Sequence, residues 1–294
     1  MVLAVLFFLF WFPEVELSHE SYHPWFEGRA DECCLLASID DAKGTITRAE
    51  FGRSESVVEV AGFWKGYVLE RGKPLGVYLD KYSTYKINHK NAVDNSELMT
   101  QFQRMMKALG IELITAHSPE AKGRIERLFG TLQDRLVKEL RLAGISTIPE
   151  ANVFLRDVFI PAFNAHFEVA AAQEGDLHRP LTDIEKSNLD ATFSVHSMRR
   201  VRNDFTVQFE NQWLQLEKIQ PCTVLRNDAV LIERRLDGTL HIRLREHYLA
   251  FKILPVRPER LHERVTALVP RKGPWKPPEN HPWTKPFKPQ LRQG

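Results

Sequence analysis

The stretch GKPLGVYLD (residues 72–80) places a short apolar run between a glycine and an acidic residue. Such a run, preceded by a helix-like segment, is typical of a buried strand in an α/β sheet. The predicted strand ends at Asp80, and a polar stretch follows it. Because α/β proteins place reactive groups beyond the carboxyl ends of their strands, Asp80 is a candidate functional residue.

Residues 15–51 predict a meander of three strands. The segment CCLLASI (residues 33–39) is a continuous apolar run that suits a strand buried on both faces. Turn-forming residues at 40–44 separate it from a third strand, residues 45–51. Ser54 then predicts the cap of a helix that ends at Gly72.

Further helices and strands alternate after residue 80. Residues 99–109 predict a helix and residues 111–115 a strand. SPEAKGRIER (residues 118–127) predicts a helix start, because it combines a capping serine, proline at the first helical position and an acid in the first turn. This helix should run to Ala143, and residues 147–167 predict another. The alternation indicates an α/β layer.

The composition is that of a globular protein. A chain of 294 residues has room for about two domains. Hydrophobic residues make up 43% and charged residues 27%, which excludes wholesale disorder. The cysteines Cys33, Cys34 and Cys222 have no zinc-binding spacing, so we expect core thiols in a reducing cytosol.

Both ends of the chain differ from the rest. Residues 2–12 are uninterruptedly apolar, but too short to span a bilayer and without the features of a secretory signal. A buried strand, a spurious start codon or frameshift and a membrane anchor stay open for this segment (residues 1–13), and the second is favoured. At the other end, residues 257–294 hold nine Lys/Arg against three Glu, which indicates a basic, proline-rich tail.

A second domain is predicted near the C-terminus. Residues 171–202 have the mixed character of a linker. Residues 205–216 then alternate apolar and polar side chains, and Asp237-Gly238 between two apolar runs is a strong hairpin signal. Several short strands within residues 203–256 predict a small β-barrel.

Two carboxylates carry the chemical argument. Asp80 ends a strand, and Glu126 lies one turn or so into a well-capped helix, four residues after Lys122. Carboxylate oxygens are the ligands that Mg²⁺ prefers, and paired metal ions stabilise the attacking and leaving oxygens of a phosphodiester displacement. On these residues alone, a capping aspartate and a solvated glutamate paired with Lys122 remain an alternative.

Longer motifs add a resemblance. SYHPWFEGR (residues 21–29), Leu79-Asp80, SPEAKGRIER (residues 118–127) and TLQDRLVKELR (residues 131–141) resemble the integrase-core transposases of the ISNCY type. These are DDE enzymes of the retroviral integrase superfamily. The resemblance implies an RNase H-like α/β catalytic core over residues 14–170, followed by the small β-barrel. Within it, Trp25 and Phe26 are expected to plug the first hairpin.

The resemblance also implies a reaction. Family members cleave DNA at transposon ends and join the freed 3′-hydroxyl to target DNA, using two Mg²⁺ (or Mn²⁺) ions. The expected partners are double-stranded DNA and further copies of the chain, with no small-molecule substrate. A bacterial cytoplasmic, nucleoid-associated location follows, without membrane anchoring through residues 2–12.

The family's metal ligands map only partly onto this chain. The second Asp of the family corresponds to Asp80 and the final Glu to Glu126, which we therefore predict as catalytic metal ligands. The position of the first Asp is occupied by His19, and an imidazole is a poor ligand for Mg²⁺. Glu20 is one residue away and so faces the opposite side of a strand. Asp40 and Asp41 are alternatives, although a turn is the favoured interpretation of that pair.

The site is therefore expected to be impaired. The family usually carries a helix-turn-helix region upstream of the core, and this chain starts close to the first catalytic strand, which suggests a truncated copy. The main alternative is a catalytically inactive remnant that binds DNA or assembles with intact transposase. A general RNase H-like nuclease and a membrane-tethered protein are further alternatives.

Basic residues are the candidate DNA contacts. Lys122, Arg124 and Arg127 surround Glu126 in the sequence, and Lys276 lies between prolines and tryptophans of the tail. By resemblance, the small barrel contacts DNA or assembles protomers, and a purely structural cap is the alternative. The tail could equally be a disordered, solubilising segment.

Overall fold

The computed structural model describes residues 15–40, 42–54, 56–79, 93–115, 119–170 and 177–256, with Ala267, Leu268, Glu279 and His281. The apolar segment 1–13, Asp41, Asp80 and most of the basic tail, including Lys276, lie outside the described residues. The chain divides into two units. One comprises the residues up to His196 with Arg234–Thr239, and the other comprises Ser197–Glu233 with the residues from Leu240 onward.

A five-stranded mixed sheet forms the centre of the first unit, with strand order β3-β2-β1-β4-β5. Strands β1 (Val15–His23), β2 (Cys33–Asp40) and β3 (Ile46–Gly52) form the predicted antiparallel meander. Strands β4 (Gly76–Leu79) and β5 (Glu112–Thr115) run parallel to β1. This order agrees with the RNase H-like core that the sequence resemblance implied.

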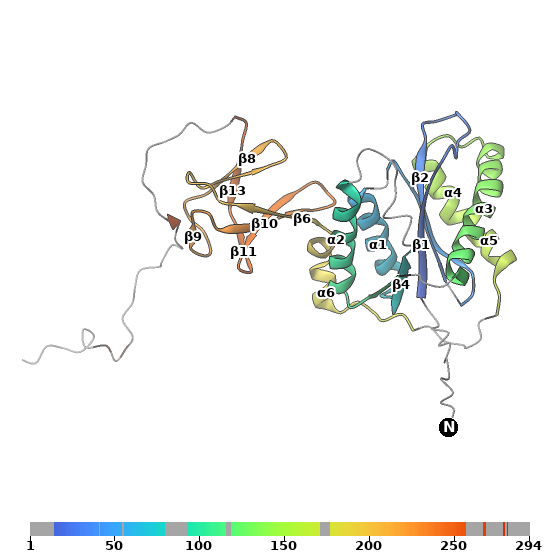
Figure 1. Cartoon of the computed structure of the whole chain (residues 1–294), viewed down its shortest axis with the longest axis horizontal. Coiled ribbons are helices and arrows are strands. Elements are labelled where there is room, and N and C mark those ends of the chain that lie inside the picture. Colours follow the sequence, from blue (N-terminus) through green and yellow to red (C-terminus); the bar gives the residue numbers. More distant parts are fainter. Residues whose placement is uncertain are drawn as a thin grey trace, which may run out of the picture. The chain divides into compact units, whose positions relative to one another are not determined.

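Helices cover both faces of this sheet (Figure 1). Helices α1 (Val57–Arg71) and α2 (Val93–Ala108) lie on one face. The other face carries α3 (Pro119–Leu142), α4 (Ile148–Phe154), the π-helical turn η1 (Leu155–Phe159) and α5 (Ile160–Phe167). None of the described helices combines the length and the apolar character needed to cross a membrane.

The two faces hold separate hydrophobic clusters, and β2 contributes to both. The α3-face cluster includes Leu35 and Ala37 with Phe129, Leu136 and Leu140 of α3. The α1-face cluster includes Cys34, Leu36, Trp64, Val77 and Phe102. Burial on both sides explains the continuous apolar run predicted for this strand. Cys33 and Cys34 are buried core thiols as predicted, and burial raises the pKa of Cys33 to about 11.

Helix boundaries differ from the prediction at two places. The cap of α1 is Ser56, whose hydroxyl accepts a hydrogen bond from the Glu59 N–H (3.3 Å), and not Ser54. Helix α2 begins at Val93 rather than at Met99, because its polar first turns give no apolar periodicity to detect. Gly72 ends α1 at φ 91°, in the region that favours glycine.

Residues 177–196, within the expected linker, pack onto the first unit as a strap. They include α6 (Asp183–Ser187) and α7 (Leu189–Thr192) and bury Leu181, Leu189 and Phe193 in the α1-face cluster. The buried Lys73 ammonium donates to both carboxylate oxygens of Glu185 (2.6 and 2.8 Å), which lowers the pKa of Glu185. The strap therefore fixes α1 and α2 against the sheet.

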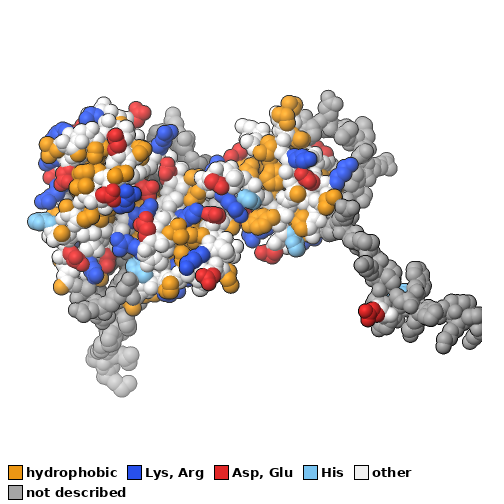
Figure 2. All heavy atoms as spheres, turned by 180° about the vertical axis from the view of Figure 1, so that it is seen from behind, with side chains coloured by type: hydrophobic (Ala, Val, Ile, Leu, Met, Phe, Trp, Pro, Cys, Tyr) orange, Lys and Arg blue, Asp and Glu red, His pale blue; other side chains and the backbone are white. Residues whose placement is uncertain are grey.

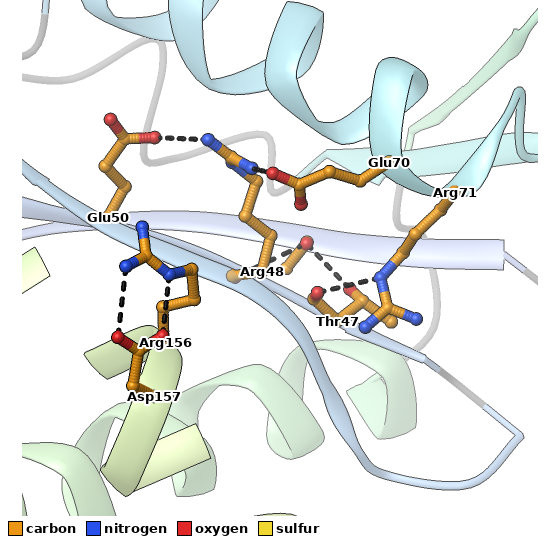
Figure 3. Close-up of polar contacts among 8 residues, drawn as sticks. Thr47, Arg48, Glu50, Glu70, Arg71, Arg156 and Asp157 are labelled. Atoms are coloured by element: carbon orange, nitrogen blue, oxygen red, sulfur yellow. Dashed lines mark hydrogen bonds and ion pairs between the residues drawn. The ribbon is translucent and has the colours of Figure 1, made fainter. Parts of the chain in front are cut away.

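A polar network joins β3 to α1 (Figure 3). The guanidinium of Arg48 lies between the carboxylates of Glu50 (2.8 Å) and Glu70 (2.6 Å), which raise its pKa against the opposing effect of burial. A Cβ atom at Gly66 would lie only 2.5 Å from Arg48 Nη2. Gly66 therefore leaves the space that Arg48 occupies, whereas a Cβ at Gly62 in the same helix would meet nothing within 4 Å.

An alanine substitution should therefore affect the stability of the chain differently at these two glycines. Gly62→Ala should stabilise the chain by about 0.5–1 kcal/mol, the helix-propensity difference between Gly and Ala. Gly66→Ala should lose that gain, because the methyl group displaces the guanidinium of Arg48 from its carboxylates. Urea unfolding measures both. In an Arg48→Ala background Gly66→Ala should behave like Gly62→Ala, and a persistent difference there would contradict the steric explanation.

Two asparagines cover the open edge of the sheet at β3. The Asn152 amide bonds the N–H (2.7 Å) and the C=O (3.1 Å) of Phe51, and the Asn164 amide bonds those of Ile46 (2.8 and 2.9 Å). Asn152 and Asn164 are twelve residues apart in the sequence. On an uninterrupted α-helix, this spacing would set their side chains about 120° apart around the helix axis. The π-helical turn η1 accommodates one extra residue, so the angle between the two asparagine side chains around the helix axis falls to about 20°.

The second unit contains three small sheets around one cluster. Strands β6 (Val195–Arg200), β10 (Ala229–Arg234), β11 (Leu240–Leu244) and β12 (His247–Leu249) form one sheet. Strands β7 (Thr206–Phe209), β8 (Gln212–Leu216) and β13 (Phe251–Leu254) form another, and β9 (Val224–Leu225) pairs with β14 (Ala267–Leu268). The predicted hairpin at Asp237-Gly238 is confirmed, but the described strands do not close into the expected barrel.

Candidate active site

The predicted metal ligands belong to β1, β4 and α3. Strand β4 ends at Leu79, and Asp80, which follows it in the sequence, lies outside the described residues. The backbone of His19 is described as part of β1, whereas its side chain is not. Glu126 is an exposed residue of α3. No group of three His, Cys, Asp or Glu suited to a metal is present among the residues described.

Strand register places position 19 next to the end of β4. Ser18 pairs with Leu79 across the parallel β1–β4 ladder, and Leu79 pairs in turn with Thr115 of β5. Position 19 is the next residue along β1, so it lies level with the carboxyl ends of β4 and β5. This is the location at which α/β proteins assemble functional groups.

The same register assigns faces to positions 19 and 20. His19 pairs with Ala37, which belongs to the α3-face cluster, whereas Glu20 pairs with Leu36 of the α1-face cluster. Directly opposed residues of an antiparallel pair share a face of the sheet. Position 19 therefore lies on the face that α3 covers, and position 20 lies on the other face.

Glu126 occupies the stripe of α3 that faces the sheet. Phe129, Val137 and Leu140 follow it at spacings that keep one side of a helix, and all three are buried in the α3-face cluster. Glu126 precedes the first of these by one turn and is exposed. Helix α3 and β1 thus bring positions 126 and 19 to the same side of the sheet.

The remaining basic candidates are only partly placed. Arg127 is exposed beside Glu126, and the side chains of Lys122 and Arg124 lie outside the described atoms, although both residues belong to α3. Lys276 lies outside the described residues.

Asp40 serves a turn. Its Oδ1 accepts hydrogen bonds from the N–H groups of Ala42 (2.7 Å) and Lys43 (3.2 Å), as expected of an aspartate that starts a turn. Asp40 pairs with Glu16 and therefore lies level with Val77, upstream of the end of β4. The turn interpretation of Asp40 is confirmed.

The motif at residues 21–29 fastens the β1–β2 hairpin to the far end of α3. Trp25 and Phe26 are buried in the α3-face cluster, which confirms them as a hydrophobic plug. Arg29 donates from Nη1 to the carbonyls of Ile145 (2.6 Å) and Leu140 (3.3 Å), and from Nε to that of Phe26 (3.0 Å). Sequence reasoning missed this role of Arg29, although the last turn of a helix is where a cation is favoured.

Helix capping by Arg29 predicts a loss of stability on truncation. Arg29→Ala should lower the free energy of unfolding by about 1–2 kcal/mol, because three backbone carbonyls lose a charged donor. Arg29→Lys should restore only part of this, since an ammonium cannot reproduce the planar fork of the guanidinium. Denaturant unfolding measures the effect.

Arg141 provides a control for this prediction. It forms an exposed ion pair with Glu27 (3.0 Å), so Arg141→Ala should change stability by less than about 1 kcal/mol. Equal losses for Arg29→Ala and Arg141→Ala would argue against a capping role.

Comparison with known proteins gives a consistent result. The chain is 37% identical over 233 residues to y4bF of Sinorhizobium fredii, described as a candidate transposase, covering 79% of this chain and 50% of that protein. It is 29% identical over 269 residues to the transposase for insertion sequence IS1202 of Streptococcus pneumoniae, covering 87% of this chain and 56% of that protein. The chain thus spans about half the length of these relatives. No family model matches it.

Solved structures show weaker likeness. The catalytic core domain of HTLV-2 integrase, determined in complex with magnesium, is 18% identical, with a TM-score of 0.36, and the match covers 50% of this chain and 86% of that one. An integrase intasome of simian T-cell lymphotropic virus is 12% identical, with a TM-score of 0.38, covering 83% of this chain and 80% of that one. By sequence, the chain is therefore a relative of these two transposases, which it matches over about half of their length.

Proposed function

We propose that the chain is the catalytic portion of a transposase that cleaves DNA and joins 3′-hydroxyl ends to target DNA, with activity reduced by His19. The observation that supports it is the register of β1, β4 and α3. That register sets position 19 level with the end of β4, on the face of the sheet that also carries Glu126.

The donor set fits a divalent cation in part. Asp80 directly follows Leu79, the last residue of β4, in the sequence. Asp80 and Glu126 then offer the carboxylate oxygens that Mg²⁺ or Mn²⁺ prefers. His19 offers an imidazole nitrogen, which suits these hard cations poorly.

Each residue has a distinct part in the proposed reaction. Asp80 and Glu126 hold two metal ions, which when bound supply charge stabilisation for the attacking and leaving oxygens. Lys122, Arg124 and Arg127 neutralise DNA phosphates beside Glu126, and Lys276 does so from the tail. The substrates are transposon ends and target duplex, and the chain acts as a homo-oligomer on DNA in the bacterial cytoplasm, at the nucleoid.

The second candidate is an inactive protein that binds DNA or assembles with intact transposase. The observation that favours it is again His19, because an imidazole stands where the family resemblance implies the first of three carboxylate ligands. A strand alternates its faces, so Glu20 cannot take over this role without a bulge in β1, and β1 pairs with β2 residue for residue through this region.

Restoring the aspartate predicts a gain of activity. His19→Asp should raise Mg²⁺-dependent joining of pre-cleaved transposon ends to plasmid DNA by about 100-fold or more, because Lewis-acid stabilisation is worth several kcal/mol. The measurement is a strand-transfer assay on agarose gels, with Mn²⁺ titrated by calorimetry into the same proteins. Adding Glu126→Gln to His19→Asp should return the product to background.

Asp134 supplies the matched control. It is an exposed carboxylate of α3 that pairs with Lys138, so Asp134→Asn in the His19→Asp background should leave strand transfer unchanged. If His19→Asp binds no additional Mn²⁺ and joins no DNA while remaining folded, the catalytic proposal fails and the inactive remnant is the better description.

A further inference from the structure

Three arginines stand together at the end of β6 in the second unit. Arg199, Arg200 and Arg202 occupy three of four consecutive positions, and all are exposed. Val201, between them, is buried in the cluster of the unit, which fixes the backbone from which they project. None of the three takes part in the ion pairs formed among the described residues.

Three other basic residues of this unit form ion pairs with carboxylates. Arg243 pairs with the buried Glu233 (3.1 Å), Arg245 pairs with Asp228 (3.6 Å), and Lys252 pairs with Glu217 (3.8 Å). Basic and acidic side chains are likewise interspersed over the face of the molecule shown in Figure 2. Pairing therefore distinguishes the three arginines from Arg243, Arg245 and Lys252.

The three side chains are also held in place. The Arg199 guanidinium lies 5.5 Å from the ring centroid of Phe209, and that of Arg202 lies 4.5 Å from Trp213. Arg202 also donates to Gln208 Oε1 (2.5 Å), and Arg200 donates to the Asn227 carbonyl (3.1 Å).

A guanidinium placed over an aromatic ring keeps its N–H edge available for an anion. Because each side chain is already restrained, binding an anion costs less conformational entropy than it would for a free arginine.

We propose that Arg199, Arg200 and Arg202 form a surface that binds the phosphates of duplex DNA. Planar guanidinium groups match phosphate oxygens in pairs. Phosphate contacts fix the position of a protein on DNA, but they do not distinguish one base sequence from another. The choice of DNA as the source of phosphate rests on the proposed function. Of the roles left open by the sequence, the surface favours DNA contact over protomer assembly.

The salt dependence of DNA binding tests this surface. The full chain, in EDTA, is titrated against a fluorescent duplex of arbitrary sequence over a KCl series, and binding is followed by anisotropy. Each phosphate contact contributes about 0.9 to the slope of log K against log [salt], so Arg199→Gln with Arg202→Gln should flatten the slope by about 1.8. Arg199→Lys with Arg202→Lys should keep the slope, because the charges remain.

The matched control removes two paired charges from the same unit. Arg245→Gln with Lys252→Gln changes net charge equally, but its cations already have carboxylate partners, so the slope should stay at the wild-type value. Denaturant midpoints check that each variant is folded.

Equal slopes for the two glutamine doubles would overturn the proposal. So would displacement of the duplex by an equal charge concentration of poly-glutamate, which would indicate an acidic protein partner. The assay contains no divalent metal and no cleavage step, so its outcome is independent of whether the chain joins DNA strands.

Discussion

The parallel pairing of β1 with β4 is the constraint on which the first unit depends. β1 joins the antiparallel meander to the parallel pair β4–β5, so its register sets the level of every strand end. Shifting that register by one residue would exchange the two faces of β1 and move position 19 from the α3 side to the α1 side. Burial on both faces of β2 prevents such a shift, because each face packs into its own cluster.

The contacts that hold α3 on the sheet also fix the position of Glu126 along β1. Apolar residues from Leu128 to Leu140 press the helix onto the sheet, and Arg29 holds its last turn to the β1–β2 hairpin. The helix cannot slide along β1 without breaking these backbone contacts. The asparagines of α4 and α5 act similarly at the opposite edge, where they occupy the hydrogen-bonding groups of β3 that another strand would otherwise pair with.

Much of this fold follows from sequence patterns because its elements are marked locally. The apolar run at 33–39, the helix-start motif that precedes α3 and the turn at Asp237-Gly238 each carry their own signal. The β7–β8 turn does not, since Glu210 and Asn211 adopt φ 44° and 62°, and glutamate rarely enters that region. The π-helical turn η1 was not predicted from the sequence either. Pro161 gives a local reason for it, because proline lacks an N–H and crowds the preceding turn of the helix.

The candidate site, like the fold, could be predicted from the sequence only in part. Asp80 and Glu126 were identifiable because a strand end and a helix start flank them, and their mutual placement stays a proposal. The roles of Arg29 and of the three arginines at β6 depend on partners far away in the sequence or on the absence of carboxylate partners among the described residues, which no local pattern encodes. The stretch around Val201 was interpreted as part of a linker because of its mixed character, yet Val201 itself is buried.

Replacement of a metal ligand need not weaken the fold that holds it. Carboxylates that converge on one site repel each other when no cation is bound, so the full ligand set costs stability. In the proposed site, an imidazole in place of a carboxylate at position 19 would remove one such charge while leaving the β1 ladder intact, since the ladder consists of backbone hydrogen bonds to β2 and β4. Selection on folding alone would therefore retain β1 and α3 in a chain with the proposed impaired site. Persistence of the architecture and loss of the chemistry are thus compatible in one chain, because they depend on different atoms.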